Sequence, residues 1–264
     1  MLKKIILLVF AVFALGTVAQ NKCEIIAHRG ASFDAPENTV ASIKLAWKMG
    51  SPAAECDIHL SKDNRIVVIH DPNVERTAGG VKLMVKDANS AELRKLDFGS
   101  FKADKYKGEK IPFLEELIDT IPAKRKLFVE IKCEAEIIPY LQKILDGHKK
   151  RKQIVIIGFN LETVAQAKKA FPDIPVYWLA YSGRDEETKQ WIPYSQDLIV
   201  QAKANSLDGL DLHYGALNAE FVQQVHNAGM KLYVWTVDEP NAVEMMRKFS
   251  VDGITTNRPN LFLK

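Results

Sequence analysis

The feature that most constrains the fold is a regular alternation of short apolar runs with amphipathic segments. Eight runs rich in β-branched residues are typical of strands, at 24–28, 53–60, 126–132, 153–159, 175–180, 207–213, 231–237 and 253–256. Segments with helical spacing lie between them, at 39–49, 114–120, 137–147, 161–171, 194–205, 219–228 and 241–249. Apolar strands that alternate with helices form parallel sheets covered by helices, so eight of them predict a closed (β/α)8 barrel.

One strand-like run interrupts this alternation. Residues 65–70 follow the second strand after only three residues, 62–64, whereas a parallel partner needs a crossover of about a dozen residues. We therefore predict a hairpin, which returns His70 toward the end of the second strand. We predict that the long segment 72–112 is a small insertion after this hairpin. The whole of 21–264 is then a single barrel domain.

The first twenty residues have the pattern of a secretory signal peptide. Lys3 and Lys4 precede an apolar run that ends in small residues near Ala19. The run is short for a membrane span of ~20 apolar residues. We predict cleavage near Ala19 or Gln20 and a secreted or periplasmic protein with no stable membrane insertion, an uncleaved anchor being the alternative.

Net charge and cysteine content exclude several classes of protein. The formal net charge of +3 falls to +1 without Lys3 and Lys4, which leaves no basic field for nucleic acid. Three cysteines are too few for a disulfide framework. A small-molecule ligand is the remaining expectation, and the sequence leaves the oligomeric state open.

Acidic residues gather at the ends of two predicted strands. Glu55 and Asp57 lie on the second strand and Glu130 on the third, where alternation points all three into the barrel. Three buried carboxylates repel one another, and a divalent cation relieves that repulsion. Oxygen-only ligands favour Mg²⁺ or Ca²⁺. The alternative is a buried salt-bridge network with Arg29 and Lys132.

Two histidines complete the constellation. His28 and His70 both fall at strand ends, and imidazoles can transfer protons near neutral pH. Arg29 and Lys132 lie beside them and suit an anionic phosphate. Together these residue types predict a metal-assisted acid/base hydrolase that acts on a phosphate substrate.

These residues also carry a family resemblance. Ten motifs match in order: His28-Arg29-Gly30, Ala35-Pro36-Glu37-Asn38-Thr39, Glu55-Cys56-Asp57-Ile58, Ser61-Lys62-Asp63, Val67-Val68-Ile69-His70-Asp71, Glu75-Arg76-Thr77, Gly108-Glu109-Lys110-Ile111-Pro112, Val129-Glu130-Ile131-Lys132, Trp235-Thr236-Val237 and Thr256-Asn257-Arg258-Pro259. The chain thus resembles the glycerophosphodiester phosphodiesterases. The resemblance implies a TIM barrel with a small insertion, and hydrolysis of glycerophosphodiesters to glycerol 3-phosphate and an alcohol.

By matching motif, the resemblance assigns one divalent cation to Glu55, Asp57 and Glu130, the phosphate to Arg29 and Lys132, and proton transfer to His28 and His70. Trp235 is implied to pack against the glycerol carbons, and a core aromatic is the alternative. The choice between Mg²⁺ and Ca²⁺ stays open. The sequence also does not decide which histidine is the acid and which is the base. The nucleophile is either water or the neighbouring glycerol hydroxyl, which would give a cyclic phosphate.

Two other functions fit the same residues. An enzyme similar to the phosphatidylinositol-specific phospholipases C would leave a cyclic phosphate as product. A secreted, non-catalytic headgroup-binding protein would keep Arg29 and Lys132 but would not hydrolyse its ligand. The alcohol of the substrate is not fixed by the sequence, and the loops 72–112 and 181–193 are expected to determine it.

Overall fold

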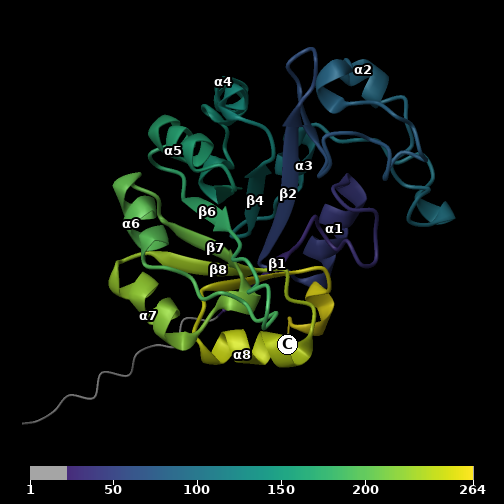
Figure 1. Cartoon of the computed structure of the whole chain (residues 1–264). Coiled ribbons are helices and arrows are strands. Elements are labelled where there is room, and N and C mark those ends of the chain that lie inside the picture. Colours follow the sequence, from purple (N-terminus) through teal and green to yellow (C-terminus); the bar gives the residue numbers. More distant parts are fainter. Residues whose placement is uncertain (1–22, 264) are drawn as a thin grey trace, which may run out of the picture.

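The fold is a closed barrel of eight parallel strands, as predicted (Figure 1). The computed structural model describes residues 23–263, so the predicted signal peptide at 1–20 lies outside the described residues. Strand β1 pairs with both β2 and β9, which closes the sheet. The barrel strands are β1 (Glu24–Ala27), β2 (Ala53–Leu60), β4 (Lys126–Ile131), β5 (Ile154–Gly158), β6 (Val176–Ala180), β7 (Gly209–His213), β8 (Lys231–Trp235) and β9 (Gly253–Thr256).

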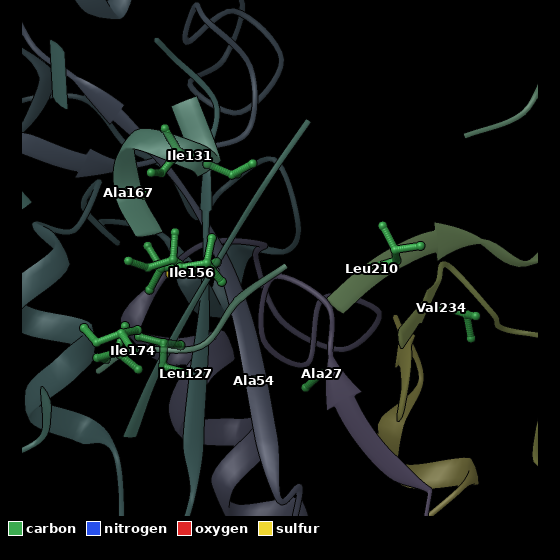
Figure 2. Packing of buried hydrophobic residues seen from close by; sticks show 14 of the residues in the cluster. Ala27, Ala54, Leu127, Ile131, Ile156, Ala167, Ile174, Leu210 and Val234 are labelled. Carbon is green, nitrogen blue, oxygen red and sulfur yellow. The ribbon is translucent and has the colours of Figure 1, made fainter. Parts of the chain in front are cut away.

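Helices cover the outside of the barrel (Figure 1). They are α1 (Val40–Met49), α3 (Leu114–Thr120), α4 (Ile138–Leu145), α5 (Leu161–Ala170), α6 (Asp197–Ala204), α7 (Ala219–Asn227) and α8 (Pro240–Lys248). Figure 2 shows part of the apolar layer between sheet and helices, where Leu127, Ile131 and Ile156 belong to the same buried cluster as Ala167 of α5. Burial of this layer from water is the main force that holds the helices on the barrel.

A second group of buried residues fills the barrel interior. The rings of Phe128, Tyr177 and Tyr233 pack together, with centroids 4.9 Å apart for the two tyrosines. Nearer the carboxyl ends of the strands the inward side chains become acidic, with Asp57 and Glu130 fully or almost fully buried. In a (β/α)8 barrel this is the end that carries the active site.

The hairpin predicted after β2 is present. Strand β3 (Ile66–Val68) runs antiparallel to β2, and Asn64 adopts the left-handed conformation (φ 61°) in the turn between them. The amide of Ile69 then donates to the carbonyl oxygen of Asp57 at 3.0 Å. This contact places His70 at the carboxyl end of β2.

The predicted insertion has an apolar core of its own. Val74, Val85 and Leu93 are buried together with Val67 and Ile69 of the hairpin. The short helix α2 (Ser90–Leu93) belongs to this unit, which lies beside β2 and β3 (Figure 1). The insertion therefore packs on the hairpin that carries His70.

The helix predicted at 194–205 begins later than expected, because α6 starts at Asp197. The preceding residues form a loop that folds back through a bridge between Arg184 and Trp191. The hydroxyl of Tyr194 donates to the carbonyl of His213 at 3.0 Å and holds this loop at the barrel mouth. Within residues 23–263, no helix has the length and apolar character needed to cross a bilayer.

Candidate active site

Three carboxylates meet at the carboxyl end of the barrel. Glu55 and Asp57 come from β2 and Glu130 from β4, and the strand register pairs Asp57 with Glu130. One oxygen of each lies within 4.8 Å of the others, and the three residues are 0 to 7% exposed. The structure thus brings together the three acids for which strand alternation predicted a common face.

Two oxygens of this acidic cluster lack a hydrogen-bond partner. Among the described residues, Glu55 Oε1 and Asp57 Oδ1 are buried and accept no hydrogen bond. Burial, together with the neighbouring carboxylates, raises the pKa of Glu55 well above its usual value and that of Glu130 to about 7. Buried carboxylate oxygens without a hydrogen bond are costly, and an all-oxygen donor set is the one preferred by Mg²⁺ and Ca²⁺. The residues present therefore fit a divalent cation.

Two cations adjoin the acidic cluster. Nε of Arg29 lies 3.3 Å from Asp57 Oδ2, and Nζ of Lys132 lies 2.7 Å from Glu130 Oε1 and 3.7 Å from Asp57 Oδ1. Burial raises the pKa of Asp57, but these cations outweigh it and hold that pKa below its usual value. The ion-pair network considered as an alternative to a metal site is thus present. It still leaves oxygens of Glu55 and Asp57 without hydrogen bonds.

A tight turn after β1 explains how Arg29 reaches the acids. Arg29 and Gly30 both adopt left-handed conformations, with φ of 54° and 79°. The turn aims the backbone N–H of Arg29 at Glu55 Oε2, at 2.7 Å. A Cβ on Gly30 would lie 2.5 Å from the backbone of Ser42, so this position requires glycine.

Asn38 fixes the central carboxylate of the cluster. Its Nδ2 donates to Asp57 Oδ2 at 2.7 Å, and its Oδ1 accepts from the backbone N–H of Asp57 at 3.1 Å. Asn38 is buried and precedes Thr39, the N-cap of α1. The start of α1 therefore orients an acid on the neighbouring strand.

His28 follows β1 and faces the acidic cluster. Its Nε2 lies 4.0 Å from Glu55 Oε2, and its Nδ1 lies 2.8 Å from Asn257 Oδ1. Asn257 in turn donates to Asp238 at 2.7 Å, so the ring is held by a chain of hydrogen bonds. Burial, with Arg29 adding to it, lowers the pKa of His28 to about 4 and keeps the imidazole neutral at neutral pH.

His70 lies where the hairpin returns to the barrel. It follows Ile69, whose amide is bonded to Asp57, and its Nδ1 lies 2.7 Å from Asp71 Oδ1. Nε2 of the buried His59 lies 3.1 Å from the carbonyl oxygen of His70. The second predicted imidazole is therefore held at the end of β2 by both its ring and its backbone.

A network that was not predicted from the sequence joins the two sides of the site. Arg76, in the insertion, donates to Asp71 at 2.7 Å and to both oxygens of Glu37 at 2.7 and 2.8 Å. Glu37 also accepts from Nη1 of Arg29 at 2.9 Å, and Asp71 holds His70. One guanidinium thus links the positions of His70 and Arg29.

Arg76→Ala is expected to lower kcat about tenfold with a smaller change in KM, because small displacements of reacting groups cost rate. Arg65→Ala is a matched control in steady-state kinetics. Arg65 is 46% exposed against 45% for Arg76, and it pairs with Glu115. Equal losses in the two variants would argue against a positioning role for Arg76.

Aromatic rings line the barrel mouth beside Lys132. The Phe159 centroid lies 5.4 Å from that of Trp235 and 5.6 Å from Nζ of Lys132. The ring of His213 lies 5.4 Å from Trp235 and 4.4 Å from Trp191. Trp235 also packs on the interior aromatic cluster. Both sequence-based interpretations of Trp235 are therefore compatible with its position, at the top of the core and at the edge of the site.

Asp211 is a buried acid that was not singled out from the sequence. It lies on β7, is 1% exposed, and its Oδ1 has no partner among the described residues. Burial, with Glu130 adding to it, raises the pKa of Asp211 well above its usual value. Strand alternation could have identified Asp211 from the sequence, because Asp211 and His213 lie two residues apart and share the inward face of β7.

A closed (β/α)8 barrel with acids, imidazoles and cations at the carboxyl ends of its strands has the architecture of a TIM-barrel enzyme, and its charged groups suit a phosphate ester. Comparison with known families agrees. Residues 28–261 match the Glycerophosphoryl diester phosphodiesterase family, and the chain belongs to this family. It is therefore a phosphoric diester hydrolase with glycerophosphodiester phosphodiesterase activity.

Individual relatives support this assignment. A glycerophosphodiester phosphodiesterase of Caldanaerobacter subterraneus is 34% identical over 247 residues, which covers 92% of this chain and 97% of that protein. One from Bacillus subtilis is 32% identical, covering 90% and 85%. A solved phosphodiesterase of Oleispira antarctica, in complex with the product sn-glycerol-3-phosphate, has a TM-score of 0.82 and 28% identity, covering 91% and 95%. The predicted resemblance and fold class are confirmed.

Proposed function

We propose that this protein hydrolyses glycerophosphodiesters to glycerol 3-phosphate and an alcohol, with one divalent cation and two histidines. The observation that carries the proposal is the buried acidic cluster next to His28, in which one oxygen of Glu55 and one of Asp57 accept no hydrogen bond within the described residues. The sn-glycerol-3-phosphate product bound to the Oleispira protein supports the same product here.

Glu55, Asp57 and Glu130 would hold the cation, as Mg²⁺ or Ca²⁺. When bound, it would polarise a non-bridging oxygen of the phosphate. The protein already orients each acid, because the amide of Arg29 bonds to Glu55, Asn38 bonds to Asp57, and Lys132 bonds to Glu130. Such fixed partners maintain ligand geometry in metal sites.

Arg29 and Lys132 would bind the phosphate. The guanidinium offers paired N–H donors that match two phosphate oxygens, and the ammonium adds a compact charge. Both side chains are partly exposed, at 18% and 16%, so they can reach substrate and the acids. The glycerol carbons would pack against the neighbouring rings of Phe159 and Trp235.

His28 and His70 would transfer the protons. One removes a proton from the nucleophile and the other protonates the leaving alkoxide. Nδ1 of each ring is occupied, by Asn257 in one case and Asp71 in the other, which leaves Nε2 available for the reaction. The oriented rings suit proton transfer in a fixed direction.

The function is tested by following glycerophosphocholine, glycerophosphoethanolamine and glycerophosphoinositol by ³¹P NMR. The expected product is glycerol 3-phosphate. A cyclic phosphate that accumulates as the final product would favour the phospholipase C-like route, and one that rises and then falls would indicate attack by the neighbouring hydroxyl. Binding without turnover of any diester would support the non-catalytic alternative.

We also propose that the protein is exported to the periplasm or the medium, on the basis of the Lys3-Lys4 start and the apolar run that follows it. Expression of the full chain in a bacterial host is expected to give an exported product whose first residue lies near Gln20 or Asn21. An intact N-terminus in the membrane fraction would instead indicate an uncleaved anchor.

A further inference from the structure

A cleft of about 330 Å³ opens beside the catalytic residues, at the carboxyl ends of β1, β8 and β9. Arg29 and Asn257 form part of its wall, and Phe33, Lys102 and Arg258 form another part. Arg29 is a proposed phosphate ligand and Asn257 holds His28. A diester bound through its phosphate therefore has this cleft next to one of its two arms.

The cleft contains two cations without acidic partners. The guanidinium of Arg258 lies 3.9 Å from the ring centroid of Phe33, and Nζ of Lys102 lies 5.9 Å from it. Lys102 donates to the carbonyl of Ser32 at 2.7 Å. Within residues 23–263 neither side chain forms an ion pair with a carboxylate. Phe33, at 50% exposure, holds two charges in place without neutralising them.

Two of the acids in the cleft wall already have hydrogen-bond partners on both carboxylate oxygens. Both oxygens of Glu37 accept from guanidinium groups, mainly that of Arg76. Both oxygens of Asp238 accept hydrogen bonds from Asn257. Glu239 is exposed at the start of α8 and has no side-chain partner within the described residues. The donors to Asp238 are neutral and leave its charge in place, so Asp238 and Glu239 are the two acids of the cleft that oppose the two cations without an ion pair, Lys102 and Arg258.

We propose that this cleft binds the alcohol half of the substrate and favours an alcohol that carries a further anionic group. This inference rests on the proposed function, because it concerns the leaving group of the same reaction. The glycerol half would occupy the aromatic side of the mouth, at Phe159 and Trp235, which leaves the cleft to the alcohol. A guanidinium and an ammonium on one ring suit a carboxylate or a phosphate.

The two sources of the anion are separated by paired substrates. Glycerophosphoserine differs from glycerophosphoethanolamine by one carboxylate, and glycerophosphoinositol 4-phosphate differs from glycerophosphoinositol by one phosphate. The anionic member of at least one pair is expected to have a kcat/KM about tenfold higher, mainly through KM, as for one charge-assisted hydrogen bond. The pair with the larger ratio identifies the group that the cleft receives.

Variants of the cleft residues test the same inference. Lys102→Met and Arg258→Met are each expected to lower kcat/KM for the substrate with the additional anionic group about tenfold, and to leave kcat/KM for the pair member that lacks this group within about twofold. Glu239→Gln removes one of the two opposing charges and should increase the preference. Lys105→Met is the matched control, because Lys105 is in the same segment but stacks on Tyr106 at 4.9 Å.

The possible outcomes separate the inference about the cleft from the proposed hydrolytic function. An active enzyme with equal kcat/KM within both pairs would refute the anionic preference and leave the proposed function standing. Equal losses on every substrate in Lys102→Met and Arg258→Met would mean that these residues only support the fold. No turnover of any diester by the wild-type protein would overturn the proposed function, and the cleft inference with it.

Discussion

Replacing His28 or His70 with alanine is expected to lower kcat on the order of 10²-fold or more, because each removes a proton-transfer group. Neither change should unfold the protein, since the barrel core does not depend on either ring. Steady-state turnover of glycerophosphocholine and circular dichroism of each variant provide the measurement. His148→Ala is the control, because His148 lies outside the site, with its Nε2 3.9 Å from Asp119.

A second substrate separates the two roles. A diester with a nitrophenol leaving group needs no proton on departure, so the variant that lacks the general acid should recover most of its rate on it. The variant that lacks the base should remain slow. Ordinary turnover of glycerophosphocholine in both variants would exclude the assignment of these histidines.

Removing divalent cations is expected to lower turnover by about 10³-fold, since a bound cation supplies several kcal/mol of charge stabilisation. Mg²⁺ or Ca²⁺ added back to chelated protein should restore it, and the better of the two identifies the preferred ion. Unchanged rates in protein shown to be metal-free would contradict the metal role of the acidic cluster.

Thermal stability provides an independent test of cation binding at the acidic cluster. A saturating cation should raise the Tm by roughly 5–10 °C, as expected for a ligand that binds only the folded state. Glu55→Gln should abolish that rise and also raise the Tm of the chelated protein, because burial and the neighbouring acids raise the pKa of Glu55 and a neutral glutamine avoids the cost of burying or protonating this carboxyl. Glu115→Gln, at an acid paired with Arg65 outside the cluster, should do neither.

Local backbone rules predicted much of the site. Alternation along β2 and β4 places Glu55, Asp57 and Glu130 on one face, because successive strand residues point to opposite sides. The three-residue turn after β2 required a hairpin, and that hairpin returns His70 to the carboxyl end of β2, where Ile69 bonds to Asp57. These predictions succeeded because each depends on geometry within a few residues.

The remaining features depend on contacts between distant loops. Arg76 reaches Glu37 across 39 positions in the sequence, and Lys102 reaches Ser32 across 70. No spacing rule connects such pairs, since the path of the insertion decides which of its charges face the barrel. The late start of α6 has the same origin, because the loop before it is held by the carbonyl of His213 rather than by helical bonds.

The separate apolar core of the insertion has a thermodynamic consequence. A unit with its own buried cluster can open cooperatively while the larger barrel stays folded. Val67 and Ile69, which precede His70, belong to that smaller cluster. We therefore expect catalytic competence to depend on the fraction of molecules in which residues 72–112 are closed, and amide hydrogen exchange in this segment would measure that fraction. Heating should inactivate the enzyme by this opening below the temperature at which the barrel melts.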